Sequence, residues 1–85
     1  MQVQTLIERA AAKYGTQTAV AEAVGVRPHR MSEWKTGTVP CPIEIQAELC
    51  ELAGLPEPEA KDHIYRAVRA LAKARRANGV GGLKS

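Results

Sequence analysis

The sequence predicts an all-α domain of five helices, and three observations support this prediction. Apolar residues recur at spacings of three and four within each uninterrupted segment. Glycine and proline divide the chain into five such segments. No stretch shows the sustained alternation of apolar and polar residues that a half-buried strand requires. With 85 residues, the chain has the length of a single domain.

The first two helices are expected on either side of Gly15. The first should run from Met1 to Tyr14, because one side of it is apolar and consists of Val3, Leu6, Ile7, Ala10, Ala11 and Tyr14. Thr16 is placed to cap a short second helix from Gln17 to Val24. Gly25 should end that helix, because glycine adopts positive φ readily and lets the chain reverse.

The third helix is expected from Pro28 to about Thr36, and Gly37 should end it. Proline suits the first turn of a helix, where its missing N–H costs nothing. The segment from Thr38 to Pro42 should be extended, because residues that precede proline avoid the α region.

Two further helices are expected after this extended segment. Helix four should span roughly Pro42 to Ala53 and bury a face that consists of Ile45, Leu49 and Leu52. Helix five should open at Pro56 or Pro58, run to about Ala77 and direct inward the apolar side chains of Ala60, Ile64, Val68 and Leu71. Residues 79–85 are then expected to form a flexible C-terminal tail on a domain of residues 1–78.

Charge is distributed unevenly along the chain, which has a net charge of +3 and a pI near 9.1. Residues 1–43 have a net charge of +2, residues 44–62 a net charge of −5, and residues 63–85 a net charge of +6. Such a chain has at least two electrostatic faces, and basic faces attract polyanions, most often nucleic acid. The alternative is that the Lys and Arg side chains only solvate helix surfaces.

Several classes of function are disfavoured by the composition. Cys41 and Cys50 are too few for a disulfide framework and fit no zinc pattern with His29 and His63, so both thiols should be reduced and structural, with Cys50 in the core. No metal or other cofactor is expected. The sequence offers no nucleophile with a base, no paired acids and no phosphate loop, so we do not expect an enzyme. No apolar run approaches the roughly 18 residues of a membrane helix and the N-terminus does not resemble a secretory signal, which favours a cytoplasmic protein without membrane contact.

The segment from Thr16 to Pro40 carries the functional signal. Two short helices joined by a tight glycine turn form a helix-turn-helix unit, expected at residues 17–36. Ala21 supplies the small side chain that a close helix crossing needs, and Gly25 supplies the turn. The apolar side chains placed to lock both helices to the domain are Val20, Val24, Val26, Met31 and Trp34. The second helix of the unit would expose Arg27, His29, Arg30, Ser32 and Glu33.

These residues resemble the Cro-type and lambda-repressor-like helix-turn-helix family. The positions of the family pattern here are Gln17, Ala21, Gly25, Val26, Met31, Trp34 and Gly37. Pro40 and the helix after it extend the match over roughly residues 3–55. The resemblance implies a five-helix DNA-binding domain with a long C-terminal helix. It also implies a sequence-specific transcriptional repressor of phage or prophage type that binds a palindromic operator as a homodimer.

The resemblance also assigns the residues that would contact double-stranded DNA. The groove-facing positions of the family correspond to Arg27, Pro28, His29, Ser32 and Glu33, with Arg30 beside them. Thr16 and Gln17 stand at the start of the second helix, where Gln17 would touch a phosphate or brace the next helix. The backbone-contacting end and loop correspond to Lys35, Thr36 and Thr38. Proline departs from the family pattern at position 28, where readout would be steric or apolar.

Other interpretations remain open for several residues. His29 either reads DNA or is a solvated surface residue. The acidic stripe of helix four is a solvated face, a partner surface or a source of ion pairs with helix five, and it consists of Glu44, Glu48 and Glu51. The basic stripe of helix five complements the helix dipole, contacts flanking DNA or forms salt bridges with the glutamates across a dimer, and it consists of Arg66, Arg69, Lys73 and Arg76. The exposed part of helix five, including Tyr65, is the candidate homodimer surface.

Two alternative functions would use the same chain. An antitoxin that represses its own operon would bind DNA and also a toxin. A phage repressor would bind DNA and could also bind a protein antagonist. A protein-interaction adaptor would keep the fold without DNA binding and would use the acidic helix four.

Overall fold

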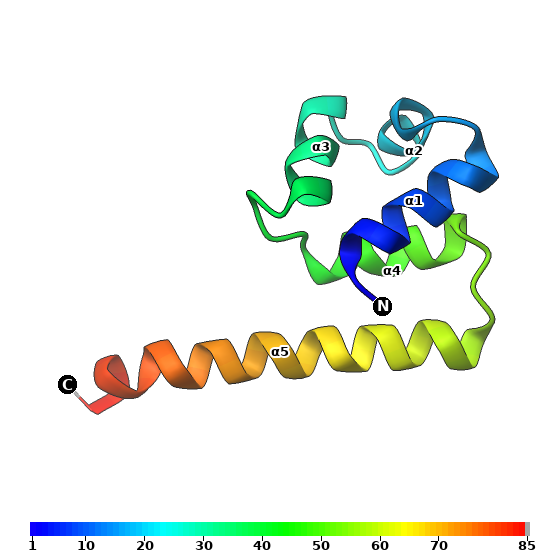
Figure 1. Ribbon diagram of the computed structural model, residues 1–85. Helices are drawn as coiled ribbons and strands as arrows, with labels where there is room; N and C mark the ends of the chain where they lie inside the picture. Colours follow the sequence, from blue (N-terminus) through cyan, green and yellow to red (C-terminus); the bar gives the residue numbers. More distant parts are fainter. Residues whose placement is uncertain (85) are drawn as a thin grey trace.

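The computed structural model describes residues 1–84, together with the side chains of residues 1–77, and every regular element in this part is a helix (Figure 1). The helices are α1 (Val3–Tyr14), α2 (Gln17–Ala23), α3 (Pro28–Thr36), α4 (Ile43–Leu52) and α5 (Glu57–Lys84). Helices α1 to α4 form a bundle, and α5 lies along one side of it and extends beyond it (Figure 1). The prediction of an all-α chain is confirmed for these residues.

The core of the bundle lies between α1 and the three other short helices, each of which packs against it. Its fully buried large side chains are Leu6, Ile7, Val20, Met31 and Leu49. Trp34 and Cys50 are also buried in this cluster, as the sequence predicted. Helix α1 has 12 residues and the other three are shorter, so they would be marginal in isolation. Removal of these apolar surfaces from water therefore stabilises the helices together.

The ends of the short helices lie close to the predicted boundaries. Helix α3 opens with Pro28 and is ended by Gly37, whose φ of 83° is left-handed. Helix α2 ends at Ala23, and α4 begins directly after Pro42. The chain between α3 and α4 is not helical, in agreement with the restriction that proline places on the residue before it.

Helix α5 is longer than the sequence predicted. It continues to Lys84, whereas an end near Ala77 was expected from Asn78 and Gly79. Glycine lowers helix stability by roughly 1 kcal/mol relative to alanine but does not forbid the conformation, and no proline interrupts residues 78–84. Of the expected C-terminal tail, only Ser85 lies outside the described residues. In the described part of the chain, none of the helices combines the length and the apolar character needed to span a lipid bilayer.

Three side chains expected on buried faces are exposed. Tyr14 is the last residue of α1 and is 50% exposed. Val68 is 46% exposed and Leu71 is 42% exposed, whereas Ala60 and Ile64 pack against the core. The bundle therefore covers only the first half of the described part of α5. Tyr65 is 61% exposed, in agreement with the expectation that part of helix five, including Tyr65, is exposed.

A buried polar link joins α5 to α4. His63 is 5% exposed, and its Nε2 lies 2.7 Å from Oε1 of Gln46. The side-chain amide of Gln46 in turn donates to the backbone carbonyl of Cys41 at 2.9 Å. Burial lowers the pKa of His63, and the positive N-terminal ammonium group lowers it further. These hydrogen bonds fix the position of α5 along α4, because a shift of one turn would leave buried polar groups without partners.

Candidate nucleic-acid interface

The α2–α3 pair begins with a capped helix and turns at Gly25. Thr16 Oγ1 accepts a hydrogen bond from the backbone N–H of Ala19 at 3.0 Å, so Thr16 caps α2 as predicted. Gly25 has a φ of 77°, which side-chain-bearing residues rarely adopt. The backbone N–H of Val26 donates to the carbonyl of Ala21 at 2.9 Å and closes the turn. Ala21 itself is fully buried, as its small size at a helix crossing predicted.

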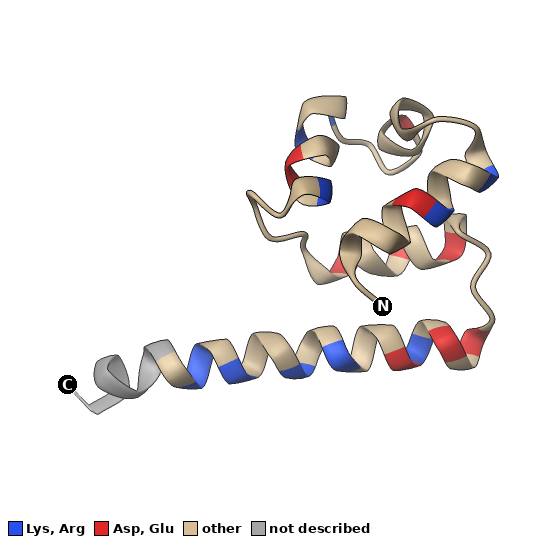
Figure 2. Ribbon diagram, viewed as in Figure 1, with Lys and Arg blue, Asp and Glu red and all other residues tan. Residues whose placement is uncertain are grey.

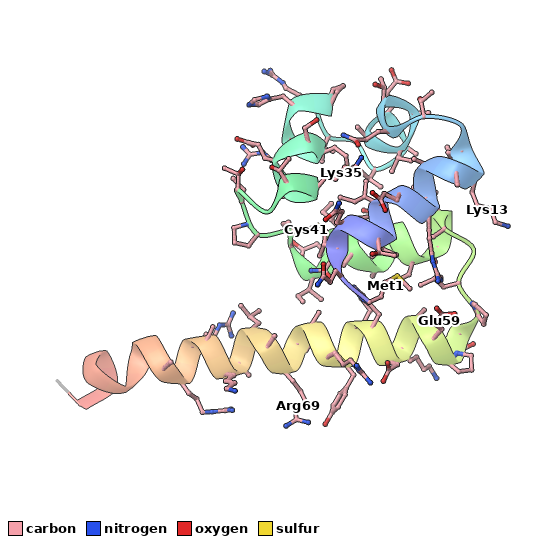
Figure 3. All side chains as sticks on the ribbon, viewed as in Figure 1. Met1, Lys13, Lys35, Cys41, Glu59 and Arg69 are labelled. Carbon is pink, nitrogen blue, oxygen red and sulfur yellow. The ribbon has the colours of Figure 1, made fainter. Side chains whose placement is uncertain are left out.

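Helix α3 has an apolar inner face and a polar outer face. Met31 is fully buried and Trp34 is 6% exposed, so these two side chains fix the rotation of the helix about its axis. The predicted site residues that are consequently exposed are Arg27, Pro28, His29, Arg30 and Ser32. Helix α3 itself lies on the side of the bundle remote from α5 (Figure 1 and Figure 3). A flat or convex partner could therefore approach this edge without meeting α5.

A hydrogen bond between side chains joins the start of α2 to the middle of α3. The amide Nε2 of Gln17 donates to the hydroxyl oxygen of Ser32 at 3.1 Å. Of the two roles expected for Gln17, the structure therefore contains the brace to the next helix. The bond also orients Ser32 on the outer face of α3.

The carboxylate of Glu33 lies between two basic side chains of the same helix. Its Oε2 is 3.6 Å from Nε2 of His29, which is charged only when protonated, and its Oε1 is 3.7 Å from a terminal nitrogen of Arg30. The side chain of Glu33 is 27% exposed, whereas those of His29 and Arg30 are 86% and 54% exposed. Both ion pairs of Glu33 are long and include an exposed basic side chain, so each contributes little to the stability of the fold. The two basic side chains can therefore exchange this carboxylate for another polar partner at small cost.

The end of α3 and the following loop place the remaining predicted residues beside this edge. Thr36 and Thr38 are exposed, and their hydroxyl oxygens lie 3.0 Å apart. The hydroxyl of Thr36 also donates to the backbone carbonyl of Glu33 at 3.2 Å. Lys35 is partly buried on the same helix. At the opposite end, a shallow hollow of about 380 Å³ is lined by Gly25, Val26, Arg27, His29 and Arg30.

The cysteines offer no reactive thiolate. Burial, with the nearby carboxylate of Glu44, raises the pKa of Cys41 to about 12. Burial likewise raises the pKa of Cys50, with a further contribution from Glu59. Both thiols are therefore protonated at neutral pH and unsuited to nucleophilic attack. Among the described residues, no group of His, Cys, Asp and Glu is placed to hold a metal ion.

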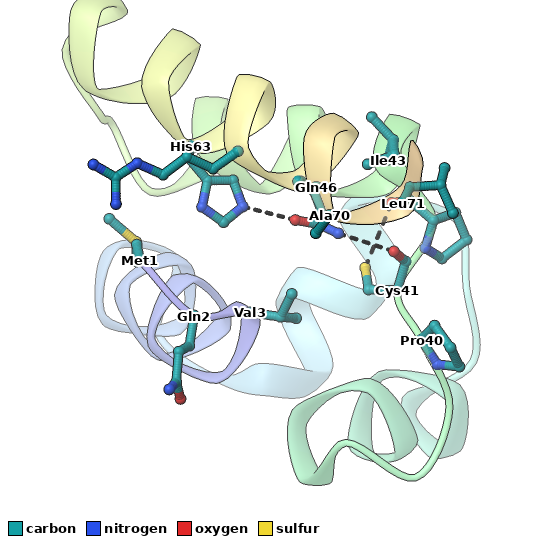
Figure 4. Close-up of a pocket in the computed structure, with 13 residues that line it drawn as sticks. Met1, Gln2, Val3, Pro40, Cys41, Ile43, Gln46, His63, Ala70 and Leu71 are labelled. Atoms are coloured by element: carbon teal, nitrogen blue, oxygen red, sulfur yellow. Dashed lines mark hydrogen bonds between the residues drawn. The ribbon is translucent and has the colours of Figure 1, made fainter. Parts of the chain in front are cut away.

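Sequence reasoning did not identify two grooves that flank α5. One, of about 600 Å³, lies between α5, the N-terminus and the segment before α4, and His63 and Gln46 line it together (Figure 4). The other, of about 560 Å³, lies between α4 and α5. Each groove is formed by residues far apart in the chain, so no local pattern signals it. The polar Gln46 and His63 on otherwise apolar helix faces were the available hint of a buried contact.

Hydrogen bonds and ion pairs thus join many of the residues that the sequence singled out, within α3, from α2 to α3 and from α3 to the loop after it. Lys35 differs from them, because it is partly buried beside Trp34 and one turn after the buried Met31. Comparison of the chain with protein-family models, with curated proteins and with solved structures finds no match. The shape, charge and hydrogen bonds of this region are therefore the basis on which a function can be argued.

Proposed function

We propose that this protein is a sequence-specific double-stranded DNA-binding regulator of transcription with a Cro- or lambda-repressor-like helix-turn-helix. The observation that carries the proposal is the division of α3 into two faces. Met31 and Trp34 anchor the inner face in the core, whereas the outer face presents Arg27, His29 and Arg30 to solvent. A short helix held in this way, with polar and basic groups outward, suits insertion into the major groove.

The proposed contacts follow from the chemistry of the exposed edge. The guanidinium groups of Arg27 and Arg30 can donate two hydrogen bonds to O6 and N7 of guanine. Glu33 can accept from N4 of cytosine once it leaves its long contacts with His29 and Arg30. Pro28, exposed in the first turn of α3, suits apolar contact with a thymine methyl group.

Contacts to the DNA backbone would position this edge. Lys35, Thr36 and Thr38 lie at the end of α3 and in the loop after it, where a positive charge and hydroxyl donors suit phosphate oxygens. Thr16 lies at the start of α2, next to Gln17, the residue that bonds to α3. Gln17 contributes by holding Ser32, so its role in the proposal is to orient α3.

We propose repression, in the manner of a small phage repressor, by a homodimer that covers a palindromic operator. An antitoxin-type autorepressor would use the same DNA surface and differ in having a toxin partner. The adaptor alternative is favoured by one observation: within residues 1–77, no ion pair involves Glu44, Glu48 or Glu51, all of which are exposed.

Selection of bound sequences from a random duplex library tests the proposal directly, because an inverted repeat would report both specificity and symmetry. On the selected duplex, Arg30→Ala should weaken binding about 5- to 150-fold, the equivalent of the roughly 1–3 kcal/mol of one bidentate base contact. Lys13→Ala is the matched control, since Lys13 is an exposed cation on α1. Equal retention of all duplexes, or of none, would contradict the proposal, and a pull-down that depends on Glu44, Glu48 and Glu51 would favour the adaptor.

A further inference from the structure

The first two turns of helix α5 are acidic on balance, although they also contain Lys61, and the turns after them are basic. Its first two turns contain the only described carboxylates of the helix, those of Glu57, Glu59 and Asp62. The next described turns are basic and carry Arg66, Arg69, Lys73, Arg75 and Arg76 (Figure 2). The helix therefore has an acidic end next to the bundle and a basic half that extends beyond it.

Three apolar or aromatic side chains of α5, at and next to its basic half, are exposed, and Leu71 among them also lines the groove next to the N-terminus. Tyr65 is 61% exposed, Val68 is 46% exposed and Leu71 is 42% exposed. The Arg69 guanidinium lies 5.8 Å from the centre of the Tyr65 ring. At about 1.5 Å per residue, the 28 residues of α5 span roughly 42 Å, close to the 48 Å length of the whole molecule. Such an extension with apolar side chains is typical of an element that packs against another chain.

The groove between α4 and α5 complements this basic half. Its floor is apolar and consists of Ala47, Cys50, Leu55, Ala60 and Ile64. Three charged side chains lie at the same groove, those of Glu51, Glu57 and Lys61, and Lys61 pairs with Glu57 at 2.9 Å. Glu51 and Glu48 are one turn apart on α4 and form no ion pair within residues 1–77, so the charge of the groove is negative on its α4 side. The second groove differs, because the charged side chain that lines it is Arg66 and no carboxylate does so. A basic helix is therefore attracted by the α4–α5 groove and repelled by the other.

We propose that the occupant of the α4–α5 groove is the basic half of α5 from a second copy of this chain. Each copy carries both the groove and the basic half, so a two-fold axis satisfies both contacts at once. The two α5 helices must run antiparallel, because a parallel pair would place basic half against basic half. Tyr65 and Val68 are buried in this arrangement, and the arginines face Glu48 and Glu51 of the partner copy.

This inference deepens the proposed function, from which it takes the expectation of a homodimer, and it assigns the basic stripe. Helix α5 lies on the opposite side of the bundle from α3, so the stripe does not face a duplex held by α3 (Figure 1). The dimer leaves the outer face of α3 uncovered in both copies. Its oligomeric state is measured without DNA, so loss of the dimer and loss of DNA binding are separate results.

Charge reversal tests the pairing on the whole chain by sedimentation equilibrium. The first variant, Glu48→Lys combined with Glu51→Lys, replaces the carboxylates of the α4–α5 groove by lysines. The second variant, Arg69→Glu combined with Arg76→Glu, replaces two arginines of the basic half of α5 by glutamates. Each variant alone should raise the dimer dissociation constant at least about tenfold, because attraction becomes repulsion. An equimolar mixture should recover the dimer, since the basic half of the first variant meets the unchanged acidic groove of the second, and the reversed pair also matches.

The control for net charge is Glu8→Lys combined with Glu22→Lys, two exposed carboxylates on α1 and α2, which should leave the dimer unchanged. Circular dichroism confirms that each variant is helical. A wild-type chain that stays monomeric at high concentration would overturn the inference. So would variants that dimerise as well as the wild type, or a mixture that does not associate.

Discussion

At the scale of single residues, the outer edge of α3 is held by weak contacts and the interior by strong ones. Glu33 is 3.6 Å from His29 and 3.7 Å from Arg30, and the basic partner in each pair is solvent-exposed. The bond between His63 and Gln46 is 2.7 Å long and buried. Exposed ion pairs are worth roughly 0–1 kcal/mol, whereas a buried polar group that loses its partner costs about 1–3 kcal/mol. The surface is therefore free to exchange partners, and the α4–α5 contact is not.

His63 makes the stability of the fold depend on pH. Its folded-state pKa lies below the ordinary value of 6.5 because burial disfavours the charged ring. The neutral ring is therefore stabilising above pH 6.5, and stability is lost as the pH falls below that value, where the unfolded chain takes up the proton more readily. Between about pH 7.5 and 5.5, we expect the free energy of unfolding to decrease by at most about 1.4 kcal/mol per pH unit from this group.

Urea unfolding followed by circular dichroism at several pH values measures this effect. His63→Gln should remove this pH dependence of the free energy of unfolding, whether or not the substitution also changes the stability at neutral pH. His29→Gln is the matched control and should retain it, because the His29 side chain is 86% exposed. A wild-type chain whose stability is independent of pH in this range would refute the prediction.

At the scale of elements, α2 depends on its cap more than the other helices do. It has seven residues, and the hydroxyl of Thr16 satisfies one of its free N–H groups. Thr16→Ala should therefore lower the free energy of unfolding by about 1 kcal/mol. Thr18→Ala removes an exposed hydroxyl from the same helix and should have a smaller effect. Urea unfolding of both variants measures the two changes in the free energy of unfolding. Equal decreases for Thr16→Ala and Thr18→Ala would argue against a stabilising cap at Thr16.

The predicted helices differ from the observed ones at features that residues nearby in the sequence do not determine. Thr16, Pro28 and Gly37 were identified correctly because caps act within one helical turn. The predicted C-terminal end of α5 was wrong, because Gly79 lowers helix propensity without excluding a helix. The apolar positions of Val68 and Leu71 were recognised, but their exposure depends on how far the bundle reaches along α5.

At the scale of the whole molecule, the two surfaces for which we propose different roles lie on opposite sides of the bundle. The outer face of α3 lies on one side and the charge-separated α5 lies on the other (Figure 1). The chain as a whole has a net charge of +3, so its long-range field attracts polyanions at low salt. The two surfaces do not overlap, so the proposed DNA binding and the proposed self-association are compatible.

The proposed DNA binding should depend steeply on salt, because each phosphate contact releases counterions. Removing one such contact by Lys35→Ala should reduce the slope of log K against log salt by about one. Lys13→Ala should leave the slope unchanged, since α1 takes no part in the proposed interface. Mobility-shift titrations of one duplex at several salt concentrations provide the slopes. A slope that Lys35→Ala does not alter would remove Lys35 from the interface.

The sequence by itself determined the helical class, the turn at Gly25 and the separation of α3 into an apolar and a polar face, because periodicity, caps and turns act between near neighbours. Only the tertiary structure decided that Gln17 bonds to Ser32, that His63 bonds to Gln46 and that α4 and α5 enclose a groove. Those contacts join residues separated by many positions in the chain. Their geometry depends on how whole helices pack, which no local pattern of side chains encodes.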